Sequence, residues 1–251
     1  MRFLLWPLML MLAACASQGA RQAGPGESAF SPVTHADFRH DTLALSWQPG
    51  FCSTESGCLP DQPKAPLIGL HGLWASEPHT LEQKGVPVQE WWRKGCDLFE
   101  DAGPAASPPL DAAMSATLAE IVPHTRQPLV PHEWNKHARC FGYAPGPFFA
   151  KGVDLRQKFA RSPVGAWMYA RQGTVIAHAD LLSFFDKATG NTQAHALQLR
   201  CGYDHQGRVV LTELWMTLRP DRLDAFPQAQ SFMAAVDAQD NCPTRFLLPR
   251  W

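Results

Sequence analysis

Six cysteines spread over most of the chain constrain its fold more than any other feature. A short basic start and an apolar run, ending at a seventh cysteine, Cys15, precede them. That run is too short to span a bilayer comfortably and is typical of an export signal. An even number of cysteines in an exported chain predicts disulfides, and six cysteines allow fifteen pairings among which the residue pattern does not choose. The six are Cys52, Cys58, Cys96, Cys140, Cys201 and Cys242.

The N-terminal segment predicts how the chain is organised. Leu12-Ala-Ala-Cys15 resembles the cleavage box of bacterial lipoproteins, in which the cysteine becomes lipid-modified. The alternative is ordinary cleavage after Ala16 or Ala20, which would release a soluble protein. We therefore expect an export signal over 1–15, a flexible tether rich in Ala, Gly, Ser and Pro over 16–37, and one domain over 38–251.

The remaining pattern predicts an α+β domain, with several helices packed on a central antiparallel sheet. Apolar or alternating runs indicate four strands, at Leu43–Trp47, Leu67–Trp74, Leu197–Tyr203 and Val209–Leu218. The last two would form a hairpin around residues 204–207. Helices are expected at Val88–Glu100, Leu110–Val122, from about Pro131, and at Asp154–Phe159, Pro163–Arg171 and Asp180–Lys187. Breaks rich in Pro or Gly are expected at Gly103–Pro109 and Ala144–Pro147.

Residues 132–137, His-Glu-Trp-Asn-Lys-His, concentrate ionisable groups in one short segment. A helix turns about 100° per residue, so with His132 at zero, Lys136 lies near ~40°, Glu133 near ~100° and His137 near ~140°. All four ionisable side chains would then project to one side of a single helix. A solvated charged face is the alternative, but two imidazoles interleaved with an acid and a base point to proton transfer.

His71 lies in a second informative segment, an apolar run that reads as a buried strand. A lone histidine in such a run is often a hydrogen-bonded core residue. The flanking glycines, Gly69 and Gly72, favour a functional role instead, because glycine inside a strand often marks the close approach of a ligand or another backbone.

A metal site is the competing explanation for the histidines. A zinc-protease helix carries His-Glu-x-x-His, with ligands four residues apart. Here His132 and His137 are five apart, and Lys136 would place a cation beside the ion. We therefore expect no metal and no other cofactor.

Together, His71-Gly-Leu-Trp74 and His132-Glu-Trp-Asn-Lys-His137 resemble the two signature segments of the ribonuclease T2 family, the secreted acid endoribonucleases. The stretch from Leu43 to Cys52 resembles that family's first core strand and the cysteine after it. Order and spacing agree from about residue 40 onward. The chain departs from the family pattern at Ala75, where proline is usual, and at Ala138-Arg139, where Gly-Thr is usual. Arg139 could add a phosphate contact or point to water, and of the two we expect water.

This resemblance implies a ribonuclease T2-like fold and the pairs Cys96–Cys140 and Cys201–Cys242, which leave Cys52–Cys58. It also implies metal-free cleavage of single-stranded RNA through a 2′,3′-cyclic phosphate, with little absolute base specificity. Mapped onto this chain, the family's roles make His137 the base and His71 the acid. His132 would hold the phosphate, Glu133 and Lys136 would support the transition state, and Trp74 would pack beside the substrate.

Composition limits the partners. The chain has 22 Lys+Arg against 23 Asp+Glu, which argues against a broad basic surface along a nucleic-acid backbone. An enzyme that grips one or two nucleotides of RNA remains compatible, and no obligate protein partner is implied. Membrane contact is expected only through a lipid at Cys15, which would make the protein a periplasmic or outer-membrane-anchored lipoprotein.

Two other functions stay open: a metal-dependent hydrolase, and a catalytically silent envelope protein that binds RNA or serves as a scaffold. A pair of histidines, one charged and one neutral, predicts a rate maximum below or near neutral pH. The histidines without chemical neighbours in the sequence are expected to be structural or surface residues: His35, His79, His124, His178, His195 and His205. Trp91 and Trp92 are expected in the core or on a helix face.

Overall fold

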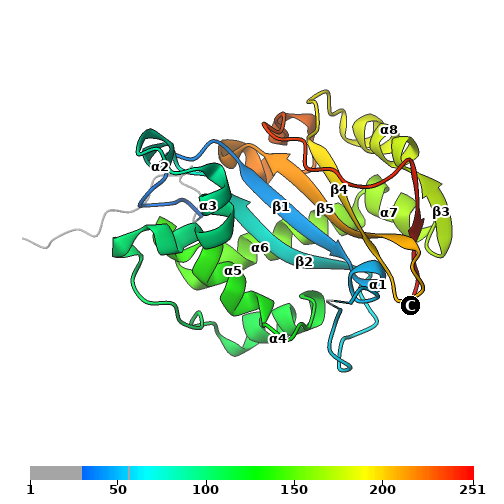
Figure 1. Cartoon of the computed structure of the whole chain (residues 1–251), viewed down its shortest axis with the longest axis horizontal. Helices are drawn as coiled ribbons and strands as arrows, with labels where there is room; N and C mark the ends of the chain where they lie inside the picture. Colours follow the sequence, from blue (N-terminus) through cyan, green and yellow to red (C-terminus); the bar gives the residue numbers. More distant parts are fainter. Residues whose placement is uncertain (1–29, 56) are drawn as a thin grey trace, which may run out of the picture.

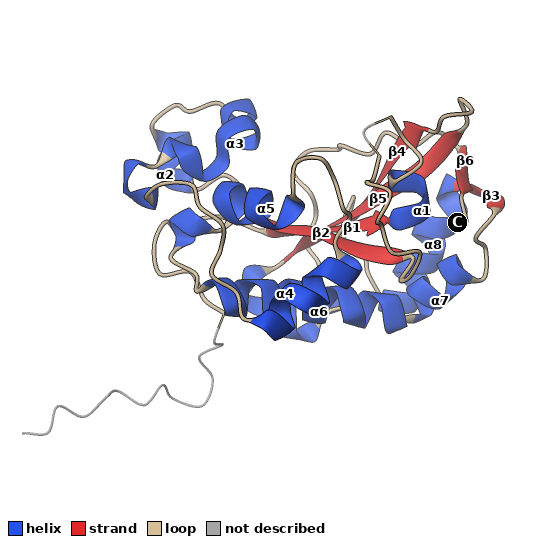
Figure 2. Cartoon of the chain, turned by 90° about the horizontal axis from the view of Figure 1, so that it is seen from below, coloured by secondary structure: helices blue, strands red, loops and turns tan. Residues whose placement is uncertain are grey.

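The structure, a computed structural model, describes residues 30–55 and 57–251. These residues form a six-stranded sheet with helices on both faces (Figures 1 and 2). The expected export signal, Cys15 and residues 16–29 of the expected tether lie outside the described residues. Within the described part, no helix has the length and apolar character needed to cross a membrane.

The strands are β1 (Asp41–Trp47), β2 (Ile68–Ala75), β3 (Thr174–Ala177), β4 (Leu197–Tyr203), β5 (Val209–Leu218) and β6 (Arg245–Leu248). The α-helices are α1 (Gln48–Phe51), α2 (His79–Gln83), α3 (Val88–Lys94), α4 (Ala112–Ile121), α5 (Leu129–His137), α6 (Pro145–Arg161), α7 (Pro163–Tyr169) and α8 (His178–Thr189). Short 3₁₀ turns are η1 (Gly95–Leu98), η2 (Glu100–Ala102), η3 (Arg139–Phe141), η4 (Pro220–Ala225) and η5 (Ala229–Ser231).

The α+β architecture is as expected. The sheet runs in the order β2-β1-β5-β6-β3, and β4 pairs with β5. All pairs are antiparallel except β5–β6, which is parallel. The strands β3 and β6 were not predicted, because each is only four residues long and shows little alternation.

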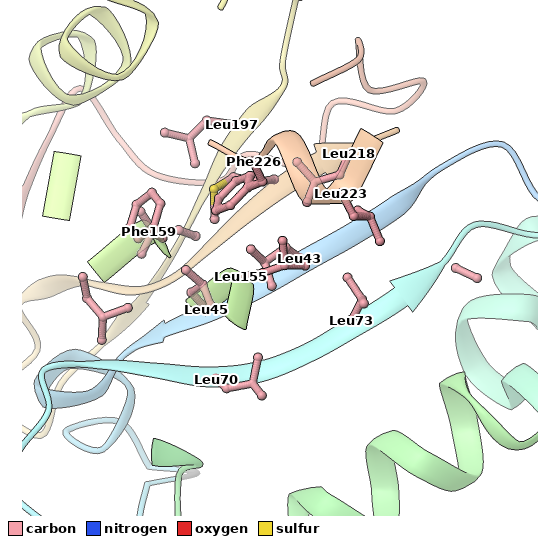
Figure 3. Packing of buried hydrophobic residues seen from close by; sticks show 14 of the residues in the cluster. Leu43, Leu45, Leu70, Leu73, Leu155, Phe159, Leu197, Leu218, Leu223 and Phe226 are labelled. Carbon is pink, nitrogen blue, oxygen red and sulfur yellow. The ribbon is translucent and has the colours of Figure 1, made fainter. Parts of the chain in front are cut away.

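The hydrophobic core lies between one face of the sheet and the helices α4, α6 and α7 (Figure 2). Alternate residues of β1, such as Leu43 and Leu45, point to this face and pack near Leu155 and Phe159 of α6 (Figure 3). Because side chains alternate along a strand, the remaining residues of the central strands point to the opposite face. There α2, α3 and α5 cover only one end of the sheet (Figure 2).

A β-bulge at His71 alters this alternation in β2. Leu45 pairs with Leu70 and Ala44 pairs with Gly72, so His71 is an extra residue without a partner on β1. As a result Leu70 and Leu73, three residues apart, both point into the core (Figure 3). A bulge re-aims neighbouring side chains and is common beside active sites. Here it brings His71 and Trp74, also three residues apart, to the same open face.

The helix α5 begins at Leu129, two residues before the expected start at Pro131. Pro131 is the third helical residue, and the first turn tolerates proline because its N–H groups have no intrahelical partner. The same reason makes one prediction wrong: the expected break at Ala144–Pro147 is the start of α6, with Pro145 at its first position.

The helix expected over Val88–Glu100 is also interrupted, since α3 ends at Lys94 and is followed by η1. Gly95 ends it with a φ of 54°, a conformation that favours glycine. A Cβ at this position would also collide with the backbone of Lys136. The break therefore lets this segment pack closely against α5.

The structure forms the three disulfides implied by the family resemblance: Cys52–Cys58, Cys96–Cys140 and Cys201–Cys242. The Cys96–Cys140 bridge joins η1 to the turn directly after α5. Residues near 30–37, assigned to the tether from sequence, contact the folded body. Phe30 stacks on Tyr143 with ring centres 4.6 Å apart, and the backbone N–H of Val33 donates to the carbonyl of Phe141.

Candidate active site

A cleft of about 400 Å³ lies on the open face of the sheet, beside α5. Its lining includes every residue predicted from the two sequence segments: His71, Trp74, His132, Glu133, Lys136 and His137. Thus β2 and α5, separated by more than fifty residues of chain, contribute to one pocket. These six residues bring three imidazoles, a carboxylate, an ammonium and an indole to it.

The helical prediction for residues 132–137 agrees with this arrangement. All four ionisable side chains of the segment line the cleft. Trp134 points elsewhere and packs against Phe148 of α6, and the side-chain oxygen of Asn135 accepts from the backbone N–H of Ala106. The periodicity of the helix therefore separates the charged residues from the packing residues.

His71 is held between two carboxylates. Its Nδ1 lies 2.6 Å from Oε1 of Glu213 on β5, and its Nε2 lies 3.8 Å from Oε1 of Glu133. Burial alone would lower the pKa of His71, but the ion pair with Glu213 and the charge of Glu133 outweigh it and raise the pKa to about 9. The imidazole is therefore positively charged at neutral pH.

His137 is in the opposite electrostatic environment. Burial, followed by the charges of Lys136, His132 and His71, holds the pKa of His137 well below its usual range. Its Nδ1 is buried and has no hydrogen-bond partner among the described residues. The ring stacks on Trp74, with centroids 5.4 Å apart and planes 29° apart. This imidazole is therefore neutral at neutral pH.

Glu133 is almost fully buried between the sheet and α5. Its Oε2 accepts a hydrogen bond from Nε1 of Trp74 at 2.5 Å. Burial raises the pKa of Glu133 to about 7, against the opposing effects of His71 and the Trp74 hydrogen bond. A Cβ on Gly72 would occupy the place of this carboxylate, which explains the glycine in the strand. The close approach predicted at Gly72 is therefore made by a side chain of α5.

The two remaining residues of α5 supply positive or polar groups to the cleft. The ammonium of Lys136 forms no salt bridge with any acidic residue in the part of the chain that the structure describes. His132 lies edge-on to His137, with ring centres 6.3 Å apart, and its Nδ1 is 3.4 Å from the amide of Gln127. Burial, then the charges of Lys136 and His71, lower the pKa of His132.

His132, Glu133 and His137 could also hold a metal ion by distance alone, since one ligand atom from each lies within 4.8 Å of the others. The surroundings fit a cation poorly. The charged His71 is close to Glu133, and Lys136 lines the same cleft. Trp74 already occupies one oxygen of Glu133.

Sequence reasoning missed several residues of this cleft. Glu213 and Trp215 of β5 line it, as does His40, whose buried Nδ1 lacks a partner among the described residues. Glu213 lies in an alternating strand in which one face was expected to be polar. Nothing in the sequence around it therefore indicated that Glu213 would contact His71. Trp91 is buried as expected, whereas Trp92 is 42% exposed and lines the cleft.

Arg139 does not point to water, so that expectation is wrong. Its side chain is only 8% exposed. The guanidinium donates to the carboxylate of Asp97 and to backbone carbonyls of Gly103 and Asn135. Arg139 therefore fixes the end of α5 to the 97–103 segment, next to the Cys96–Cys140 bridge.

The sheet and α5 thus present imidazoles with opposite pKa shifts to one cleft. The model of the ribonuclease T2 family matches residues 38–235, so the chain belongs to the ribonuclease T2 family. Membership of this family supports an RNA-cleaving, endoribonuclease activity. Three disulfides are in turn typical of an exported protein.

Named proteins agree with this assignment. Ribonuclease I of Escherichia coli (strain K12) is 29% identical over 240 residues, which cover 86% of this chain and 88% of that protein. The crystal structure of RNase NT in complex with 5′-AMP superposes with a TM-score of 0.58 at 19% identity, over 86% of this chain and 100% of that chain. The SF11-RNase of Nicotiana alata gives a TM-score of 0.59 at 18% identity, over 85% and 100%. At this identity the two structures establish the fold alone.

Proposed function

We propose that this protein cleaves single-stranded RNA by attack of a ribose 2′-OH on its own 3′ phosphate, leaving a 2′,3′-cyclic phosphate. One observation carries the proposal: two imidazoles with opposite pKa shifts, His71 and His137, line the same cleft. This reaction needs a neutral base and a charged acid at the same time, and the pair offers both at neutral pH.

In the proposed reaction, neutral His137 takes the proton of the 2′-OH as the oxygen–phosphorus bond forms. The bond from phosphorus to the 5′ oxygen breaks, and His71 donates a proton to that oxygen. Because Nδ1 of His71 is engaged with Glu213, Nε2 is the nitrogen that delivers the proton. The two histidines end with exchanged protonation states, which water restores when it hydrolyses the cyclic ester.

The other residues of α5 suit the charge that develops on phosphorus. Lys136 lines the cleft and forms no salt bridge among the described residues, and we assign it, with Glu133, to stabilising the phosphorane. His132 is assigned to holding the phosphate and Trp74 to packing beside the substrate. We also propose little absolute base specificity, as the resemblance to the ribonuclease T2 family implies.

A gel assay with unstructured RNA and single-stranded DNA of the same sequence tests this function. RNA should be cut in the presence of EDTA, with 2′,3′-cyclic phosphate ends, and DNA should stay intact because it lacks the nucleophile. If EDTA stops turnover and zinc restores it, the cluster of His132, Glu133 and His137 acts as a metal site and a metal-dependent hydrolase is correct. Absence of any cleavage would favour a silent envelope protein.

The pKa shifts also predict a pH profile. As pH falls through the lowered pKa of His137, the base becomes protonated and kcat/KM should drop. As pH rises through about 9, His71 loses its proton and kcat/KM should drop again. The alkaline limb should therefore lie higher than the sequence alone suggested. Rates that keep rising beyond pH 10 would exclude His71 as the acid.

We also propose that the protein is exported and held in the bacterial envelope by a lipid on Cys15, with no obligate protein partner. The support is the sequence box at residues 12–15 and the three disulfides. A Cys15→Ala variant should move from the membrane fraction to the soluble periplasmic fraction. An unchanged membrane fraction would refute the lipid anchor.

A further inference from the structure

Glu213 is a buried carboxylate that reaches the active site from a different part of the sheet. It lies on β5, which is separated from β2 by the strand β1. Ser46 of β1 pairs with Glu213, and Arg200 of β4 pairs with it on the other side. Nδ1 of His71 lies 2.6 Å from Oε1 of Glu213 and 3.5 Å from Oγ of Ser46. A lateral row of polar groups thus crosses the sheet and ends at His71.

A second β-bulge places Glu213 in this row. Arg200 pairs with Glu213 and Cys201 pairs with Leu211, so Thr212 is an extra residue on β5. Leu211 and Leu214 can therefore both point into the core, while Glu213 points to the cleft. Both residues of the His71–Glu213 pair thus depend on a bulge in their strand.

The carboxylate of Glu213 is fixed at both oxygens. While Oε1 faces His71, Oε2 accepts a hydrogen bond from Nε1 of Trp215 at 2.9 Å. The ring of Trp215 contacts Trp74 edge-to-face, with ring centres 5.2 Å apart. The guanidinium of Arg200 lies over the same ring, 4.6 Å from its centre. The carboxylate therefore cannot rotate away from the imidazole without breaking these contacts.

We propose that Glu213 is a positioning residue that orients His71 and keeps it protonated, so that Nε2 faces the leaving oxygen. This inference rests on the proposed function of His71 as the acid. The arrangement resembles other carboxylate–histidine pairs, in which the carboxylate fixes the ring and stabilises the imidazolium.

The other charged groups around His71 do not replace Glu213. From α5, Glu133 faces Nε2 at 3.8 Å and Lys136 opposes the imidazolium charge. Burial raises the pKa of Glu133 to about 7, so this carboxyl is partly protonated near neutrality. Burial also acts to raise the pKa of Glu213, but the ion pair with His71 outweighs it and lowers that pKa. Glu213 is thus the carboxylate that keeps its charge through the working range.

The test is a Glu213→Gln variant compared with the wild type in two measurements. The pH profile of kcat/KM on RNA should have its alkaline limb shifted down by about 1–3 pH units, the range expected when a close opposite charge is removed. At pH 8 the rate should fall about twofold for a shift of one unit and about 90-fold for a shift of three, and at pH 5.5 much less. NMR titration of the His71 ring protons should show the same shift without any substrate.

Two variants separate positioning from general damage. Glu77→Gln removes another carboxylate that lines the cleft but forms no hydrogen bond or ion pair with His71 in the described part of the chain, and the alkaline limb of this variant should not move. Glu213→Asp keeps the charge and should restore part of the alkaline activity. If Glu213→Gln folds and its alkaline limb and the His71 titration stay at the wild-type position, the inference is wrong.

The proposed function can fail separately. If the wild-type protein makes no cyclic phosphate, the function is wrong, but the NMR titration still decides whether Glu213 sets the protonation of His71. Should Glu213→Gln fail to fold, Trp215→Phe offers a milder change. It removes the hydrogen bond to Oε2 and also alters the ring contacts with Trp74 and Arg200, while it leaves the Glu213 carboxylate in place. A smaller downward shift is therefore expected, and no shift would count against the inference.

Discussion

Replacing His137 by Phe should lower the rate of RNA cleavage about 10²–10⁴-fold, the usual effect of losing a general base, and leave the fold intact. The fold should survive because Nδ1 of His137 already lacks a partner, so the change strands no hydrogen-bonding group there. A phenyl ring can also keep the stacking on Trp74. The measurements are kcat/KM on a short RNA and the thermal unfolding midpoint.

His205→Phe is the matched control. His205 is an exposed histidine on the turn between β4 and β5, far along the chain from either signature segment. Its replacement should change neither the rate nor the midpoint. A His137→Phe protein that retained more than about a tenth of the wild-type rate, well short of the loss expected for a general base, would remove His137 as the base.

Replacing His71 by Gln should produce an equally large loss on RNA, about 10²–10⁴-fold, but a much smaller loss on a nucleoside 3′-(4-nitrophenyl phosphate). The nitrophenolate leaving group is stable without a proton and needs no acid, whereas the 5′ oxygen of RNA does. Gln is chosen because its amide can still donate to Glu213, so that the buried carboxylate keeps a partner.

The two histidine variants should therefore separate on the two substrates. Loss of His137 should slow both substrates, because both require removal of the 2′ proton. Loss of His71 should strongly slow the cleavage of RNA but not that of the nitrophenyl ester. If His71→Gln slowed both substrates equally, His71 would have another role, such as binding the phosphate, and the assignment of acid and base would be reversed or abandoned.

Local periodicity made part of the site predictable. The four ionisable residues of α5 share one face because a helix repeats every 3.6 residues, whatever it packs against. Gly72 likewise marked a close approach from sequence, and the structure shows the carboxylate of Glu133 in that place. The element boundaries failed at two prolines. The helix expected to start at Pro131 begins two residues earlier, and Pro145, expected to lie in a break, begins α6, because proline fits the first turn of a helix and also ends helices.

Long-range contacts were not predictable. Arg139 looked like a surface residue, yet it fixes the end of α5 through Asp97 and the backbone of Gly103. Nothing within a few residues of Arg139 indicated that the 97–103 segment would lie beside it. The same holds for the neighbours Trp91 and Trp92. Trp91 is buried in the core and Trp92 is exposed and lines the cleft, and no local feature of the sequence distinguished them.

The sequence by itself determined which chemical groups are available: the imidazoles of His71 and His137, the charged face of α5, and cysteines enough for three bridges. The tertiary structure alone decided the protonation of each imidazole. A pKa depends on burial and on charges within a few ångströms, and these come from distant strands. Glu213 reaches His71 only because β5 pairs beside β1 and each strand carries a bulge. Strand register, which no local pattern encodes at that position, therefore gives the two histidines opposite pKa shifts.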